Sequence, residues 1–103
     1  MPFGLSDTTV AIMRGILSNY PELDKAIVYG SRAKGNYKPG SDIDLTLVGC
    51  GLSHPRFLRI LEDFEESSIP YMVGLSLFDG ITDEAMRDHI LRRGQVFYQK
   101  DTK

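Results

Sequence analysis

The sequence predicts an α/β domain in which helices flank a small mixed β-sheet. Apolar residues recur at helical spacing in two segments, capping residues indicate a third helix, and short strand-like runs lie between these segments. With 103 residues, 42% apolar and 25% charged, the chain has the composition of an ordinary globular protein. We therefore expect a single domain over residues 1–103.

The N-terminal part predicts one helix followed by one strand. Either Ser6 or Asp7 can cap the helix, and Pro21 is expected to end it. The apolar stripe of this helix comprises Val10, Met13, Ile16, Leu17 and Tyr20. The apolar run 25–29, stopped by Gly30, predicts a buried strand.

A loop and an alternating strand follow. Residues 31–41 contain two glycines and a proline and predict a loop with one helical turn starting at Ser31. Residues 42–48 alternate between apolar and polar side chains, as expected of a half-buried strand. The intervening loop is short for a parallel crossover, so the first two strands are expected to be antiparallel, unlike those of a Rossmann domain.

The C-terminal half predicts two more helices and two more strands. Pro55 suits the first turn of a helix with the apolar stripe Phe57, Leu58, Leu61 and Phe64. Residues 71–78 predict a strand, and Thr82 or Asp83 can cap a last helix. Gly94 suits the position just past that helix, and residues 96–98 predict an edge strand.

Composition excludes several classes of function. The net charge of −2 and the pI near 5.6 disfavour binding of an extended nucleic acid backbone. Cys50 is the single cysteine, so neither an intrachain disulfide nor a cysteine metal cluster is expected. The sequence shows neither a secretory leader nor an apolar run of membrane-spanning length, which predicts a cytoplasmic protein without a membrane partner.

Asp42 and Asp44 place two carboxylates on one face of the second strand. Like charges this close repel each other unless a cation lies between them, and Mg²⁺ prefers one or two carboxylates together with substrate phosphates. The alternative is that Asp42 ends a turn and Asp44 lies on a solvated sheet face.

Gly30 and Ser31 directly follow the first strand. Glycine lets the backbone approach a ligand closely, and a helical turn opening at Ser31 would direct N–H groups at phosphate oxygens. Arg32 and Lys34 can neutralise phosphate charge. The alternative is a tight turn with ordinary surface cations.

Together these residues resemble the signature of the DNA polymerase β-like nucleotidyltransferases: Gly30-Ser31, ten spacer residues, then Asp42-Ile43-Asp44. The Gly-Ser-Arg-Ala-Lys-Gly motif at residues 30–35 and the small size of the chain resemble those of the minimal nucleotidyltransferases, or MNT proteins. The likeness runs along nearly the whole chain. It implies a polymerase β-like core, ATP as substrate, and a HEPN-domain protein as the partner of a toxin–antitoxin pair.

The resemblance also implies roles for individual residues. Gly30, Ser31, Arg32 and Lys34 would bind the phosphates, and Asp42 and Asp44 would ligate two Mg²⁺ ions as catalytic residues. The family places a further carboxylate in the third strand, where this chain has Gly74. Asp79 is a poor substitute, because strand alternation puts it on the opposite face from position 74.

Two hypotheses follow. The first is an Mg²⁺-dependent nucleotidyltransferase that moves a nucleoside monophosphate, AMP from ATP, to a hydroxyl group of a partner protein. The second is a catalytically degenerate, nucleotide-binding antitoxin that acts by complex formation, because Gly74 replaces the third ligand. The size and open sheet edge are compatible with homo- or hetero-oligomers. The remaining candidates, His54, His89, Cys50, Tyr29 and Tyr37, are interpreted as surface, loop or core residues.

Overall fold

The computed structural model describes residues 2–30, 33, 35, 42–49 and 51–100. In chain order the elements are η1 (Pro2–Gly4), α1 (Asp7–Leu17), β1 (Lys25–Tyr29), β2 (Ile43–Val48), α3 (His54–Glu66), β3 (Val73–Leu77), η2 (Phe78–Gly80), α4 (Glu84–Arg93) and β4 (Gln95–Gln99). The predicted α/β class is confirmed.

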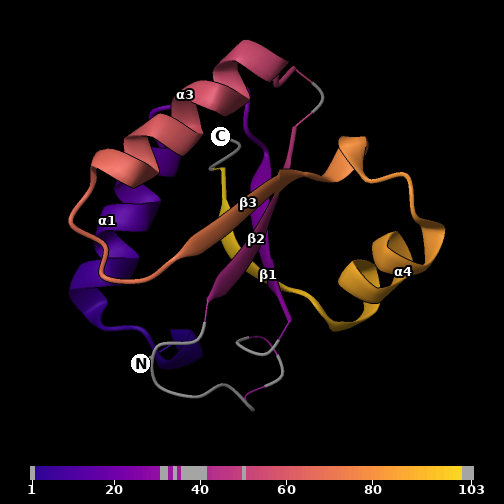
Figure 1. Cartoon of the computed structure of the whole chain (residues 1–103), viewed down its shortest axis with the longest axis horizontal. Helices are drawn as coiled ribbons and strands as arrows, with labels where there is room; N and C mark the ends of the chain where they lie inside the picture. Colours follow the sequence, from indigo (N-terminus) through magenta and orange to yellow (C-terminus); the bar gives the residue numbers. More distant parts are fainter. Residues whose placement is uncertain (1, 31–32, 34, 36–41, 50, 101–103) are drawn as a thin grey trace.

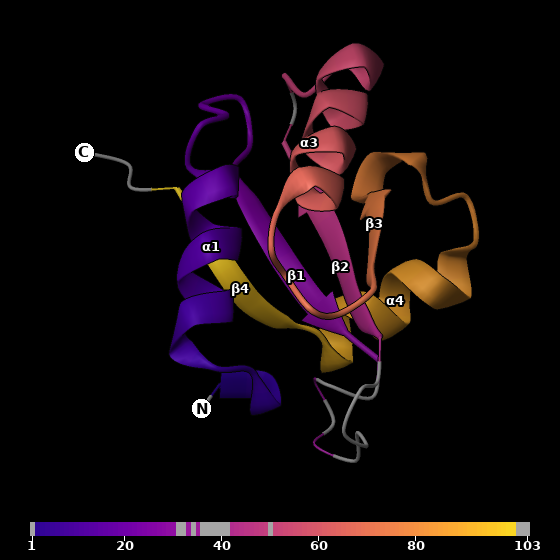
Figure 2. The same ribbon diagram turned by 60° about the vertical axis from the view of Figure 1, so that its left-hand side comes forward.

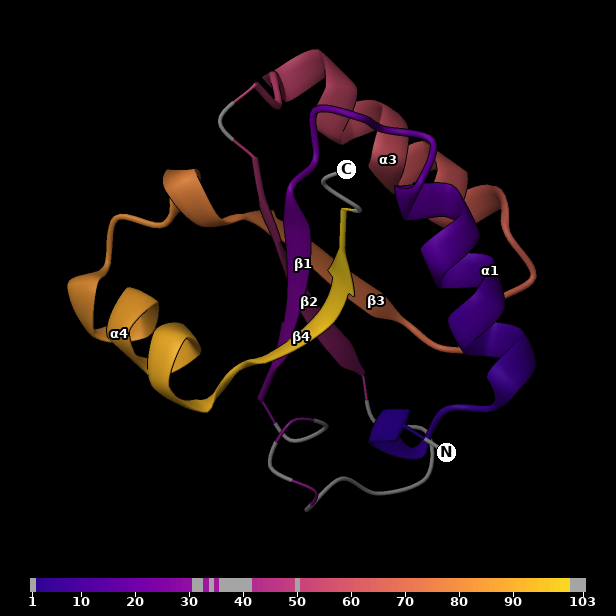
Figure 3. The same ribbon diagram turned by 180° about the vertical axis from the view of Figure 1, so that it is seen from behind.

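The four strands form one mixed sheet in the order β3-β2-β1-β4. β1 runs antiparallel to both β2 and β4, whereas β2 and β3 are parallel. The antiparallel pairing of the first two strands was predicted from the short loop between them. Figure 3 shows β4 beside β1, which makes β4 and β3 the two edge strands of the sheet.

Helices cover the sheet unequally. Figures 1 and 2 show α1 and α3 together on one face and α4 on the other. The α1/α3 face holds the larger core, which contains Met13, Val28, Leu45, Ile60 and Phe97 among its buried side chains. The α4 face holds a small second core of Ile27, Phe78 and Ile90. Strand alternation divides the residues of β1 between these two cores.

Side-chain caps fix the start of each helix. The oxygens of Ser6, Ser53 and Asp83 accept hydrogen bonds from the first-turn amides of α1, α3 and α4, respectively. Ser6 therefore caps the first helix rather than Asp7, and Asp83 caps the last rather than Thr82. The prediction that Pro21 ends α1 was wrong. The helix ends at Leu17, and Tyr20 lies buried in the turn that follows.

The predicted stripe of α3 was wrong at one position. Leu58 is 49% exposed, while Ile60 is fully buried against the larger core. Positions 57, 60, 61 and 64 follow helical spacing, and Leu58 falls one residue to the side of that face. The local sequence is apolar on both sides of this boundary, so periodicity alone did not locate it.

Gly94 lies at the end of α4 for a reason other than the predicted one. Its φ of −69° is not left-handed. A Cβ atom here would lie 2.4 Å from the Ile90 carbonyl oxygen and 2.5 Å from Ile27 Cγ2. Gly94 is thus required by the close approach of the end of α4 to β1 rather than by a left-handed cap.

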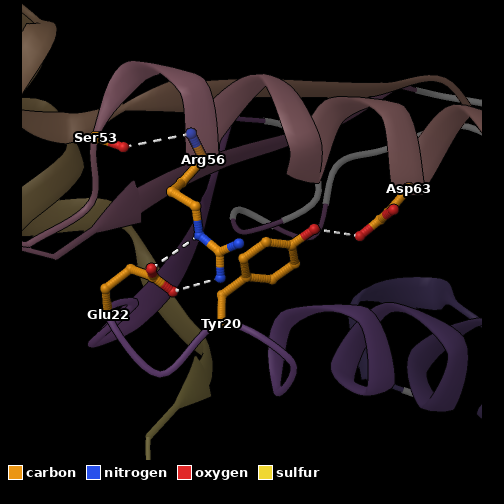
Figure 4. Close-up of polar contacts among 5 residues, drawn as sticks. All are labelled: Tyr20, Glu22, Ser53, Arg56 and Asp63. Atoms are coloured by element: carbon orange, nitrogen blue, oxygen red, sulfur yellow. Dashed lines mark hydrogen bonds and ion pairs between the residues drawn. The ribbon is translucent and has the colours of Figure 1, made fainter.

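A polar network joins the turn after α1 to α3 (Figure 4). The Arg56 guanidinium makes two hydrogen bonds to the Glu22 carboxylate, at 2.9 and 3.2 Å, and lies 4.7 Å from the centroid of the Tyr20 ring. The Tyr20 hydroxyl donates to the carboxylate of Asp63. Because these groups come from two segments, they fix how the turn packs against the helix.

No helix in the described part of the chain is both long enough and apolar enough to cross a membrane.

Candidate functional site

Three residues on neighbouring strands form a row at one end of the sheet. Tyr29 of β1 pairs with Asp44 of β2, and Asp44 pairs with Gly74 of β3. Residues paired in this way direct their side chains to the same face of a sheet. That face is the one covered by α4, because Tyr29 packs against the second core. Asp44 therefore lies in the middle of a short row, beside an aromatic residue on one strand and a glycine on the other.

The carboxylate of Asp44 lies between two glycine backbones. Gly30 follows β1 with a φ of +79°, and a Cβ atom there would lie 2.6 Å from Asp44 Oδ2. At Gly74 a Cβ atom would lie 3.4 Å from Asp44 Oδ1. The turn at Gly30 thus requires glycine both for its left-handed conformation and for the space that the carboxylate occupies.

The two aspartates differ in their surroundings. Asp42 is exposed just before β2, whereas Asp44 is partly buried within it. Burial, and then the charge of Asp42, raises the pKa of the Asp44 carboxyl above its ordinary value of 3.8. Both effects disfavour the ionised carboxylate, and a bound divalent cation would oppose both. Two carboxylates of this kind suit Mg²⁺.

A third carboxylate does not complete this pair among the described residues. Gly74 occupies the position beside Asp44 on the neighbouring strand. Asp79 lies in η2, five residues beyond Gly74 and past the end of β3. Within the described ranges, no group of three or more His, Cys, Asp or Glu side chains could hold a metal ion.

A polar pair lies next to the Asp44 row. Thr46 and Ser76 are paired in the following row, and the Ser76 hydroxyl donates to Thr46 Oγ1 at 3.0 Å. The Thr46 hydroxyl donates in turn to the Ser76 carbonyl oxygen at 3.4 Å. This bonding explains how Thr46 can be fully buried on a polar sheet face. Thr46 also pairs with Ile27 of the second core, so this row adjoins that core.

Ala33 contacts the C-terminal part of the chain. Ala33 is helical and buried, and its carbonyl oxygen accepts a 2.8 Å hydrogen bond from Gln95 Nε2 at the start of β4. No local sequence pattern indicates this contact, because the partners are 62 residues apart. The candidate phosphate ligands Ser31, Arg32 and Lys34 lie outside the described residues, as do Tyr37 and Cys50.

Neither histidine lies in the row. His54 is the exposed first residue of α3, and His89 is a partly exposed residue of α4. The structure therefore brings together Gly30, Asp44 and Gly74, with Asp42 just before the strand, and leaves the two histidines on helices.

Comparisons with known proteins show which family the sequence matches and which solved structures share its fold. The family model described as Polymerase beta, Nucleotidyltransferase matches residues 13–103. No curated protein sequence is significantly similar to the chain.

Solved structures share the fold. A toxin–antitoxin crystallised with AMP-PNP has a TM-score of 0.69 and 16% identity over 93% of this chain and 75% of that chain. A mutant of the MntA–HpeT toxin–antitoxin has a TM-score of 0.66 and 13% identity over 93% of this chain and 75% of that chain. A candidate nucleotidyltransferase from Sulfolobus solfataricus has a TM-score of 0.52 and 21% identity over 94% of this chain and 92% of that chain. At such identities the likeness is one of fold.

Proposed function

This chain belongs to the polymerase β nucleotidyltransferase family, and we propose that it binds ATP together with Mg²⁺ at the end of the sheet that carries Gly30 and Asp44. Asp44 and Asp42 would hold the metal through their carboxylate oxygens. Gly30, with Ser31, would let the backbone approach the phosphates, and Arg32 and Lys34 would neutralise their charge. The observation that carries this proposal is the position of the Asp44 carboxylate against the Gly30 backbone.

The reaction we propose is transfer of AMP to a hydroxyl group of a partner protein. The acceptor oxygen attacks the α-phosphorus, the bond from that phosphorus to the bridging oxygen breaks, and pyrophosphate leaves. The acceptor proton passes to solvent. Bound Mg²⁺ would supply stabilisation of the charge on the phosphates. The fold likeness to toxin–antitoxin structures supports a toxin as the partner, and the resemblance to MNT proteins supports a HEPN-domain protein.

A second function is favoured by Gly74. With a glycine beside Asp44, the site has two carboxylates where three would serve two metal ions. Such a site can hold a nucleotide with one metal ion and yet transfer its AMP group slowly. The chain would then neutralise its partner by forming a complex, without modifying it.

The substitution Gly74→Asp separates these two functions. A Cβ atom at this position lies 3.4 Å from Asp44 Oδ1, so an aspartate fits beside Asp44 and would add the missing ligand. We expect Gly74→Asp to bind Mn²⁺ at least about tenfold more tightly, a change of about 1.4 kcal/mol. Calorimetry without nucleotide measures it. Gly74→Asn is the matched control, since it adds nearly the same volume without the charge.

Transfer itself is measured with α-labelled ATP, Mg²⁺ and a candidate HEPN-domain partner. If the chain is an active enzyme, the wild type labels the partner and Asp44→Asn does not. If it is a degenerate binder, labelling is near zero in the wild type and rises in Gly74→Asp, while the complex persists when Asp42 and Asp44 are both replaced by Asn. Equal labelling by the wild type and Asp44→Asn would contradict the proposed site.

A further inference from the structure

β3 presents an open edge to solvent. It is the last strand of the sheet, paired only with β2 among the described strands. The Ile43 amide donates to the Met72 carbonyl oxygen at 2.9 Å, so Met72 directs its backbone groups toward β2. Backbone direction alternates along a strand, so the N–H and C=O groups of Val73 and Leu75 point away from β2, into the open edge. An open edge of this kind is a template for another strand.

An apolar groove lies beside this edge, between β3 and the second half of α3. Its volume is about 320 Å³, and Leu61, Phe64, Tyr71, Val73 and Leu75 are among its lining residues. Two large apolar side chains near it are exposed: Met72, also in the lining, by 75%, and Leu58, one turn before Leu61, by 49%. Exposed apolar surface beside an open strand edge is typical of sites where an extended peptide adds to a sheet.

Charge distinguishes between possible occupants. Glu65 is the charged side chain in the lining of the groove, as far as the structure describes it. Glu62 and Glu66 are exposed on the same turns of α3. A second copy of this chain pairing through β3 would bring the two acidic sets together, and like charges brought close cost free energy. A segment with basic residues would instead meet a complementary charge.

We propose that this β3–α3 groove is the docking site for an extended segment of a partner protein, with alternating apolar residues and flanking lysine or arginine. The segment adds to β3 as a fifth strand. Its apolar side chains enter the groove, its backbone pairs with Val73 and Leu75, and its basic residues lie near Glu65.

The same geometry would connect the groove to the candidate site. Side chains of an added strand alternate between the two faces of the sheet, about 4.8 Å from β3. Every second one would therefore lie on the face of Asp44 and Gly74, next to the position where β3 has no side chain. Docking here would bring a partner residue to the end of the Asp44 row. This consequence rests on the proposed function, whereas the docking itself does not.

The test uses the whole chain and a synthetic peptide, without ATP or metal. The probe is the capped peptide Lys-Val-Ser-Val-Ser-Val-Lys, and amide hydrogen exchange is followed residue by residue by NMR. We expect the peptide to slow exchange at Val73 and Leu75 and to leave Gly74 and Ser76 unchanged, because the latter amides already point toward β2. A copy of the peptide that is N-methylated along the edge facing β3 should protect Val73 and Leu75 less.

Charge is tested separately. Glu65→Lys should weaken binding of the lysine peptide about fivefold and strengthen binding of its glutamate-flanked counterpart. Glu84→Lys is the matched control, with the same charge change at an exposed residue of α4, on the other face of the sheet (Figure 1). Absence of alternating protection at millimolar peptide overturns the proposal. Concentration-dependent protection of Val73 and Leu75 in the free protein also overturns it, since a second copy would then cover the edge.

Discussion

Glycine is required at position 30 for two reasons, and mutations can separate their effects. Its φ of +79° is left-handed, and its missing Cβ leaves room for the Asp44 carboxylate. Gly35 has a similar φ of +83°, but no atom of the described residues lies within 4 Å of its Cβ position. We expect both Gly30→Ala and Gly35→Ala to lower the free energy of unfolding by about 1 kcal/mol through backbone strain. Thermal or denaturant unfolding measures this shared cost.

Only Gly30→Ala should displace the Asp44 carboxylate, because only there does the new methyl group meet it at 2.6 Å. Its affinity for Mg²⁺–ATP should therefore fall at least about tenfold beyond any change in Gly35→Ala, a difference of about 1.4 kcal/mol. Isothermal titration calorimetry measures both variants. Equal losses in the two would show that strain in the turn, and not the position of Asp44, controls binding.

Asp44 should make the stability of the protein depend on pH and on metal. Its folded pKa lies above the ordinary value of 3.8, so the unfolded chain releases this proton first as the pH rises. The stabilising contribution is complete below pH 3.8 and is lost as the pH rises through the folded pKa. Without metal, Asp44→Asn should therefore be more stable than the wild type at pH 7, with the difference disappearing near pH 3.

Added Mg²⁺ should invert that order, because a cation stabilises the ionised carboxylate. Melting temperatures with Mg²⁺ and with a chelator measure the inversion. The exposed Asp88, which pairs with Arg92, provides a control as Asp88→Asn. A wild type that gains no stability from Mg²⁺ at pH 7, even with ATP present, would argue against Asp44 as a metal ligand.

At the scale of elements, the Tyr20–Arg56 network determines how the turn after α1 is held on α3. Burial, reinforced by the hydrogen bond to Asp63, raises the pKa of Tyr20 to about 12 from its ordinary value of 10.0. The folded state thus retains a proton that the unfolded chain loses between these two values, and stability should fall as the pH rises from 10 to 12.

Tyr20→Phe tests this coupling. It should lower the free energy of unfolding at pH 8 by about 1 to 2 kcal/mol, since it removes a hydrogen bond to a charged group. It should also flatten the loss of stability above pH 10. Tyr98→Phe is a control of the same chemistry at a partly exposed tyrosine of β4. An unchanged alkaline slope in Tyr20→Phe would show that Tyr20 titrates alike in both states.

Local patterns in the sequence predicted the elements well. Alternation and loop length correctly predicted β2 and its antiparallel pairing with β1. The errors arose where the deciding contact is distant. The buried face of α3 depends on the sheet beneath it, and Gly94 is required by Ile27 of another element. The bond from Gln95 to Ala33 and the burial of Asp44 likewise depend on which strands become neighbours, which short-range periodicity does not specify.

The strand β4 illustrates the same limit. Its pairing with β1 shifts register between Ala26 and Ile27, so Phe97 is an extra residue in the ladder. Phe97 is buried in the larger core, and its carbonyl oxygen accepts a 3.2 Å hydrogen bond from Arg14 Nε of α1. The apolar run 96–98 predicted a strand, but a bulge stabilised by a helix 83 residues away has no local signature.

The whole molecule is built from two cores of unequal size, and this should divide its stability. In the described part of the chain, α1 and α3 share the larger core, whereas α4 is held by the small cluster of Ile27, Phe78 and Ile90. Segments with few buried apolar contacts open at lower free energy than the rest of a domain. Native-state hydrogen exchange should therefore show the α4 amides exchanging through local opening, while those of α1 and α3 require global unfolding.

Two matched truncations test this division, since Ile60 and Ile90 are both almost completely buried. Ile60→Ala should lower the global free energy of unfolding by about 3 kcal/mol, as expected for a large-to-small change in a well-packed core. Ile90→Ala should accelerate exchange mainly in α4 and lower the global value less, because α4 can detach while the larger core stays intact. Equal global losses in the two variants, with uniform exchange along the chain, would instead show that the two cores unfold as one unit.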